Sequence, residues 1–248
     1  MTFEELAWGA FFYRLLTNYD RPYVSLFGGE SLLERLRQNP AAVSADEFQA
    51  TVGDFLRRWG GRHIKNDTEV GRALLDGLGG LRSTFQSLCS DTLLAADLGQ
   101  RRGLVQDVFD GLRLICWENR GPFRSVTVHL GETFASKLAH IMNPALFVMW
   151  DDGIAGDFCT RGMIGSLWDY VGFLEAMQRE ARSAVSSFQA SAGSGDAALF
   201  LSQELGYRVT KQLAKFLDEY NWVCNQRSLR TCIPPGWLLS LPRRGHQA

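Results

Sequence analysis

One lysine and a pair of aspartates, all in the segment 125–158, have the side chains best suited to chemistry in this chain. Lys137 follows Phe134 by three residues and Leu130 by seven, so it borders an apolar helical stripe. A lysine amine that faces inward is desolvated, which lowers its pKa and makes it a nucleophile or a proton carrier. The alternative is that the stem covers apolar surface while the ammonium group reaches solvent. Spacing alone leaves both open.

The aspartates Asp151 and Asp152 follow the apolar run Ala145–Trp150. An aspartate at such a position is typical of a helix N-cap, where it accepts hydrogen bonds from free backbone N–H groups. It could also be a buried acid. The two roles are compatible, because a cap fixes the carboxylate in space and an active site needs it fixed.

The elements that must position these residues are predicted to be mostly or entirely α-helical. Apolar residues at helical spacing predict helices over 1–20, around 32–40, 44–59, 105–116, from about 125, 164–190 and 196–220. Residues 66–88 form either two shorter helices or one closely packed helix, because glycines interrupt the pattern. Capping-box spacing at Thr2/Glu5 and Ser44/Glu47 marks two helix starts. Strand signals are weak, at 125–130 and 145–150. We expect one all-α domain over residues 1–248, either undivided or built from two lobes.

Charge and composition limit the classes of function. The chain has 26 basic and 27 acidic residues, so its bulk charge does not point to a nucleic-acid partner. From Leu205 onward, however, seven basic residues oppose only Asp218 and Glu219, a net charge of plus five. Two further basic clusters comprise Arg57, Arg58, Arg62 and Lys65, and Arg101, Arg102, Arg120 and Arg124. Each is either a solvated face or part of a local basic rim around one DNA-binding site.

The chain carries no apolar stretch long enough to cross a bilayer and no secretory signal pattern. Its five cysteines are widely spaced and form no C-x-x-C pair, so we expect reduced cysteines, a cytoplasmic location and no zinc site. No Gly-rich phosphate loop or dinucleotide fingerprint is present, and no cofactor is expected. A monomer without a membrane partner is the simplest expectation.

The run Ser136-Lys137-Leu138-Ala139-His140, followed by 143–147 and Trp150-Asp151, resembles the helix-hairpin-helix superfamily of DNA glycosylases, above all its divergent 8-oxoguanine-type branches. The resemblance covers residues 119–158. It implies a two-lobed all-α fold whose cleft, here near 117–158, receives a base flipped out of DNA. By position, Lys137 matches the catalytic lysine and Asp151 the essential aspartate. Asp152 is the alternative, because the register of a doublet is ambiguous.

The sequence departs from the family pattern in two places. The hairpin turn before the lysine is reduced to Leu130-Gly131-Glu132, which weakens the case for a metal-assisted hairpin grip on DNA phosphate. The spacing of 14 residues between Lys137 and Asp151 is shorter than is typical. A monofunctional glycosylase could therefore use Asp151 without Lys137 as a nucleophile.

The resemblance also indicates which side chains would contact substrate. Cleavage of an N-glycosidic bond builds positive charge on the sugar, which a fixed carboxylate stabilises. The residues assigned to base stacking or DNA binding are Trp117, Phe147, Trp150, Trp168, His140, Arg120, Arg124, Arg227 and Arg230. Aromatic residues on helical stripes are otherwise ordinary core residues, which is the alternative for the first four.

Three functions remain open at this point. Some bacterial proteins of this broad type remove glucosylated hydroxymethylcytosine from phage DNA and leave abasic sites as an antiphage defence. The second is an 8-oxoguanine-type repair glycosylase with AP-lyase activity. The third is a non-catalytic helical module that binds DNA or a protein, in which Lys137 reaches solvent and Asp151 is only a cap. The glycosylase hypothesis requires that the Lys137 amine and the Asp151 carboxylate face the same side, beside a cleft.

Overall fold

The computed structural model describes residues 1–61, 64, 67–120, 125–192 and 194–225. Within them the chain is mostly helical, and the strands form one antiparallel hairpin. The first half contains α1 (Phe3–Leu16), α2 (Asp20–Phe27), α3 (Glu30–Gln38), η1 (Pro40–Ala42), α4 (Ala45–Phe48), η2 (Gln49–Gly53), α5 (Asp54–Arg58), α6 (Thr68–Gly80) and α7 (Arg82–Ser87). The second half contains α8 (Leu98–Arg113), β1 (Cys116–Arg120), β2 (Ser125–His129), α9 (Glu132–Met142), α10 (Asp152–Thr160), α11 (Tyr170–Ala192), α12 (Ala197–Glu204) and α13 (Leu213–Asn225).

Local capping signals place several helix starts where the sequence predicts them. Thr2 and Glu5 form a complete capping box at α1, and the Ser44 hydroxyl accepts from the Glu47 N–H at α4. Asp151 is the N-cap of α10, as predicted. These contacts involve neighbours in the sequence, so they depend little on the rest of the fold.

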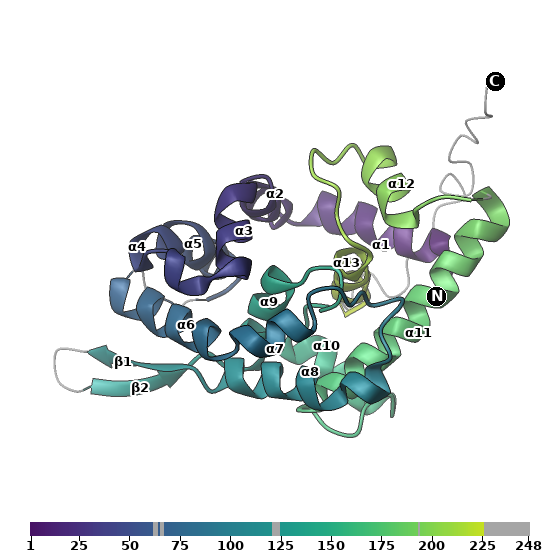
Figure 1. The fold of residues 1–248 in the computed structure, drawn as a ribbon. Coiled ribbons are helices and arrows are strands. Elements are labelled where there is room, and N and C mark those ends of the chain that lie inside the picture. Colours follow the sequence, from purple (N-terminus) through teal and green to yellow (C-terminus); the bar gives the residue numbers. More distant parts are fainter. Residues whose placement is uncertain (62–63, 65–66, 121–124, 193, 226–248) are drawn as a thin grey trace.

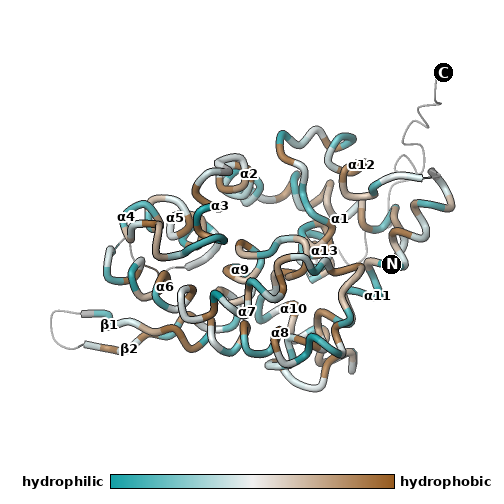
Figure 2. The backbone as a smooth tube through the Cα atoms, viewed as in Figure 1, coloured by the Kyte–Doolittle hydropathy of each residue, from teal (hydrophilic) through white to brown (hydrophobic). Residues whose placement is uncertain are grey.

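Helices α9 and α13 lie in the middle of the molecule (Figure 1). Helices α2–α6 gather on one side of them, and α1, α11 and α12 on the other, while the hairpin extends away from the helices (Figure 1). Apolar and polar stretches alternate along most helices, as in amphipathic helices that share a core (Figure 2). Helix α13 is buried on nearly every side, since its buried residues include Ala214, Phe216, Leu217, Asn221 and Val223.

The structure corrects three predictions about the elements. The region after Ile115 holds a β-hairpin that pairs Cys116 with His129, so the chain is not entirely helical. The helix expected over 164–190 begins at Tyr170, where Asp169 accepts a hydrogen bond from the Gly172 N–H. The helix expected over 196–220 is two helices, because Gly206 adopts a left-handed φ of 65° just beyond α12. Residues 66–88 form two helices, one of the two predicted alternatives.

Among the described residues, each helix is too short or too polar to cross a bilayer.

Helix α1 approaches α13 most closely at Gly9. A Cβ atom at this position would lie 2.6 Å from the Tyr220 Cα, which is backbone and has no rotamer to change. We expect Gly9→Ala to lower the free energy of unfolding by about 1–3 kcal/mol, measured by urea denaturation. Gly103→Ala in α8 is the matched control: a Cβ there meets nothing within 4 Å. It should raise stability by about 0.5–1 kcal/mol, and equal effects of the two changes would refute the close approach.

Candidate functional site

The Lys137 amine points into the protein. The side chain belongs to α9 and is 7% exposed. Its Nζ donates a hydrogen bond to the Trp59 carbonyl oxygen at 2.9 Å and lies 4.5 Å from the centre of the Phe134 ring. Of the two alternatives that the sequence leaves open, the inward one therefore holds. Burial lowers the pKa of Lys137 to about 8, against the opposing effect of the Asp218 and Asp151 carboxylates.

Asp151 is held at the start of α10. Its Oδ1 accepts a hydrogen bond from the Ile154 N–H at 2.9 Å, and the residue is half-buried. Asp152 is exposed, and its Oδ1 accepts from the Thr133 hydroxyl at 3.3 Å. Of the two carboxylates, Asp151 is thus the one that is both fixed by backbone and partly withdrawn from solvent.

A buried serine couples the lysine to the aspartate. The Ser136 Oγ accepts from the Trp150 N–H at 3.1 Å and also lies 3.1 Å from the Trp150 carbonyl oxygen. Ser136 precedes Lys137, and Trp150 precedes Asp151. The bond therefore ties α9 to the start of α10 one residue before each candidate catalytic side chain. It fixes the spacing of the amine and the carboxylate, whose charges interact.

Five charged residues form a buried ion-pair network beside Lys137: Asp20, Lys211, Lys215, Asp218 and Glu219. Lys211 Nζ lies 2.5 Å from Asp20 Oδ1 and 2.6 Å from Glu219 Oε1. Lys215 Nζ lies 2.6 Å from Asp218 Oδ2 and 3.3 Å from Glu219 Oε1. The sequence analysis assigns both lysines to a basic C-terminal stretch, but their side chains are fully buried. The two lysines are balanced by Asp218 and Glu219, so the net charge of plus five rests on the exposed Arg208 and on four arginines that lie outside the described residues.

Aromatic rings lie beside Lys137 and this network. The Trp59 ring centre lies 5.6 Å from Lys137 Nζ and 4.7 Å from Lys215 Nζ. Two half-buried rings, Tyr19 and Trp222, continue this wall, with Tyr19 5.5 Å from Trp59 and 6.5 Å from Trp222. We call Tyr19, Trp59 and Trp222 the aromatic wall. Neither the aromatic wall nor the buried ion-pair network is predicted from the sequence. The i, i+3, i+4 spacing of Lys215, Asp218 and Glu219 was the signal available for the network.

Of the four aromatic residues predicted to stack on a base, three are buried and one is exposed. Trp117, Phe147 and Trp150 are 7%, 0% and 2% exposed. Phe147 and Trp150 pack on the Tyr170 ring, at 6.4 and 5.2 Å between ring centres. These three are core residues in the structure, which is the alternative stated above. Trp168 is 53% exposed, with the Arg113 guanidinium 5.5 Å from its ring centre.

His140 is an internal residue rather than a DNA contact. It is fully buried, with Nδ1 2.6 Å from the Phe147 carbonyl oxygen and Nε2 3.1 Å from the Tyr23 hydroxyl. Burial lowers the pKa of His140 to about 3, so the ring stays neutral at physiological pH. Arg120 ends strand β1, whereas Arg124, Arg227 and Arg230 lie outside the described residues.

The lowered pKa of Lys137 should make the stability of the protein depend on pH. The unfolded chain, with a lysine pKa of 10.5, binds more protons than the folded one between pH 8 and 10.5, so wild-type stability should rise with pH in that window. Below about pH 8 the buried charge costs up to about 3 kcal/mol. We therefore expect Lys137→Met to be more stable than wild type at pH 7 and to lose that advantage by pH 10.5, in urea titrations.

Lys215→Met is the control for this prediction. Burial lowers the pKa of Lys215, but Asp218 and Glu219 raise it by more, so its folded-state pKa is elevated. Its removal should destabilise the protein at pH 7, the opposite sign. A stability difference between Lys137→Met and wild type that does not change from pH 7 to pH 10.5 would contradict the assignment.

Comparison of the chain with protein-family models, with curated proteins and with solved structures finds no match in any of the three. Among the described residues, no group of three or more His, Cys, Asp or Glu side chains is placed to hold a metal ion.

Proposed function

We propose that the protein is a DNA glycosylase that cleaves the N-glycosidic bond of a modified base flipped out of DNA. The observation that supports this most is a buried amine of lowered pKa whose charge interacts with that of a carboxylate fixed at a helix N-terminus. At pH 7 a lysine with a pKa of about 8 is a free amine about a tenth of the time, far more than an ordinary lysine.

The two side chains have complementary roles in this reaction. Loss of the base leaves positive charge on the sugar, and the Asp151 carboxylate stabilises that charge and orients an attacking water. Alternatively, the free amine of Lys137 attacks the anomeric carbon, and the base leaves with its bonding electrons and a proton. The sugar ring of the resulting aminal then opens to an imine, from which β-elimination of the 3′-phosphate cleaves the strand. The first route makes a monofunctional glycosylase and the second a lyase.

The aromatic wall favours a substrate that contains a planar ring. A flipped base needs an aromatic surface to replace the stacking that it loses in the duplex. The half-buried rings of Tyr19 and Trp222 adjoin Trp59, whose carbonyl oxygen binds Lys137. The wall, rather than the core residues Trp117, Phe147 and Trp150, is our proposed stacking surface.

The proposed substrate class is glucosylated hydroxymethylcytosine in phage DNA, whose excision would leave abasic sites as a defence. The test incubates the protein with glucosylated T-even phage DNA, unmodified DNA and an 8-oxoguanine duplex, and then measures alkali-labile breaks. Breaks confined to the first DNA support defence, and breaks confined to the third support a repair glycosylase. Absence of breaks in all three would overturn the proposal.

Borohydride reduction distinguishes the two routes. A covalent protein–DNA adduct in wild type that is missing in Lys137→Ala establishes lyase chemistry at this amine. Base release without an adduct establishes hydrolysis through Asp151. DNA binding without base release would instead favour the non-catalytic helical module.

A further inference from the structure

A cavity lies between α2, α3 and the segment that joins α12 to α13. Its volume is about 760 Å³, within the range of small-molecule sites. Its lining includes Phe27, Glu34, Arg37, Arg208 and Thr210. In Figure 1 this segment rises between α12 and α13.

Arg37 brings a positive charge to this cavity. Its Nε and Nη2 donate to the Ile141 carbonyl oxygen at 3.0 and 2.8 Å, which fixes the guanidinium at the end of α9. Burial lowers the pKa of Arg37, and in the described part of the chain it forms no ion pair with a carboxylate. A fixed, partly desolvated guanidinium beside a cavity favours an anionic ligand.

The other lining groups indicate what kind of anion fits. Arg208 is exposed and supplies a second guanidinium, and Thr210 a hydroxyl. Phe27 stacks on Tyr23 with 4.3 Å between ring centres, giving an aromatic side to the cavity. The carboxylate Glu34 accepts from the Gln38 amide at 3.3 Å and is suited to accept from sugar hydroxyls as well.

We infer that this cavity binds a small phosphorylated ligand of the nucleotide class, with its phosphate on Arg37 and Arg208. This site is separate from Lys137 and Asp151 and does not depend on the proposed glycosylase activity. Tyr23 lies between the two regions, because its ring lines the cavity while its hydroxyl meets His140 on α9.

Titration calorimetry with the whole chain tests this inference, using deoxyadenosine 5′-monophosphate, deoxyadenosine and inorganic phosphate as probes. We expect saturable binding of the nucleotide with a Kd below about 1 mM, and binding of deoxyadenosine at least about tenfold weaker because it lacks the phosphate. Binding of inorganic phosphate as tight as that of the nucleotide would show a bare anion site and overturn the nucleotide class.

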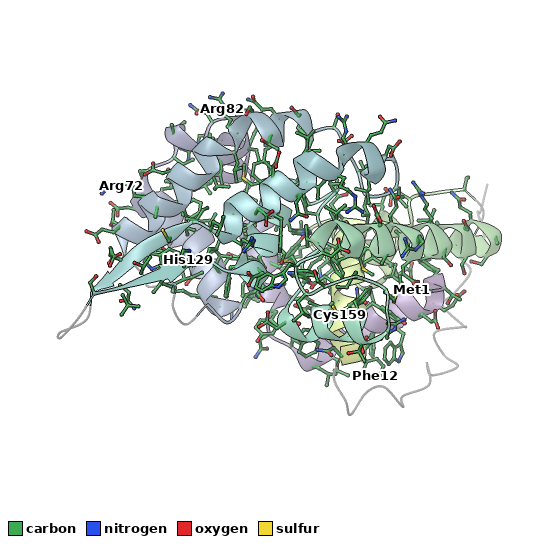
Figure 3. The ribbon with its side chains drawn as sticks, turned by 90° about the horizontal axis from the view of Figure 1, so that it is seen from below. Met1, Phe12, Arg72, Arg82, His129 and Cys159 are labelled. Atoms are coloured by element: carbon green, nitrogen blue, oxygen red, sulfur yellow. The ribbon has the colours of Figure 1, made fainter. Side chains whose placement is uncertain are left out.

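Two arginine variants locate the site. Arg208→Gln should weaken nucleotide binding by about tenfold or more, without a folding defect because the side chain is exposed. Arg82→Gln is the control: Arg82 is exposed on α7 and points outward at the edge of the molecule (Figure 3). Absence of nucleotide binding in wild type, or equal losses in both variants, would refute the inference.

Discussion

Replacing Asp151 with asparagine is expected to lower the rate of base release by about 10²–10³-fold. Asparagine caps a helix as well as aspartate does, so the start of α10 and the hydrogen bond to the Ile154 N–H should survive. What is lost is the negative charge that, in the proposed mechanism, stabilises the sugar cation. Single-turnover kinetics on the active DNA substrate, with circular dichroism to confirm the fold, measure the effect.

Asp152→Asn is the control for Asp151→Asn. The two residues are adjacent, but Asp152 is exposed and bonded to the Thr133 hydroxyl rather than to backbone. It should retain most activity. Full activity in Asp151→Asn would remove this carboxylate from the mechanism. A loss in Asp152→Asn alone would transfer the role to Asp152.

Removal of the Glu219 carboxylate is expected to have the largest effect on stability. Glu219 is fully buried and contacts both Lys211 and Lys215. Glu219→Ala leaves two buried ammonium groups with only Asp20 and Asp218. Breaking a buried ion pair in this way typically costs about 3–5 kcal/mol. Urea denaturation at pH 7 measures the change.

Glu175→Ala provides the comparison for Glu219→Ala. Glu175 pairs with Arg102 at 2.9 Å at the surface, where Arg102 is exposed and Glu175 is half-buried. Exposed pairs contribute about 0–1 kcal/mol, so this variant should be nearly as stable as wild type. Similar losses in both variants would show that the buried ion-pair network has no special role in stability.

The features that the sequence predicts correctly are those formed by residues close together in the chain. The caps at Thr2, Ser44 and Asp151 are confirmed because each involves residues three positions apart. The buried ion-pair network escapes prediction because Lys211 meets an aspartate 191 residues away. Charged residues at helical spacing normally indicate a solvated face, and only the packing of α13 in the centre reverses that.

The candidate site likewise has local features that the sequence predicts and long-range features that it does not. Spacing identifies Lys137 and Asp151 as candidates and leaves the direction of the amine open, because the lysine borders the apolar stripe. Its inward direction depends on Trp59, which lies 78 residues earlier in the chain and whose carbonyl oxygen binds the amine. The aromatic wall is likewise assembled from segments far apart in the sequence, Tyr19, Trp59 and Trp222.

The burial of the lysines has a consequence for reactions with aldehydes. The sequence has four lysines; Lys65 lies outside the described residues, and the other three, Lys137, Lys211 and Lys215, are at most 7% exposed. An abasic site in DNA carries an aldehyde that condenses with any accessible amine, whereas an arginine guanidinium stays protonated and reacts poorly. A protein that holds cations such as Arg72, Arg82 and Arg208 at its surface as arginine can touch such DNA with little accidental cross-linking. Among the described lysines, adduct formation would then report mainly on Lys137, whose lowered pKa keeps its amine reactive.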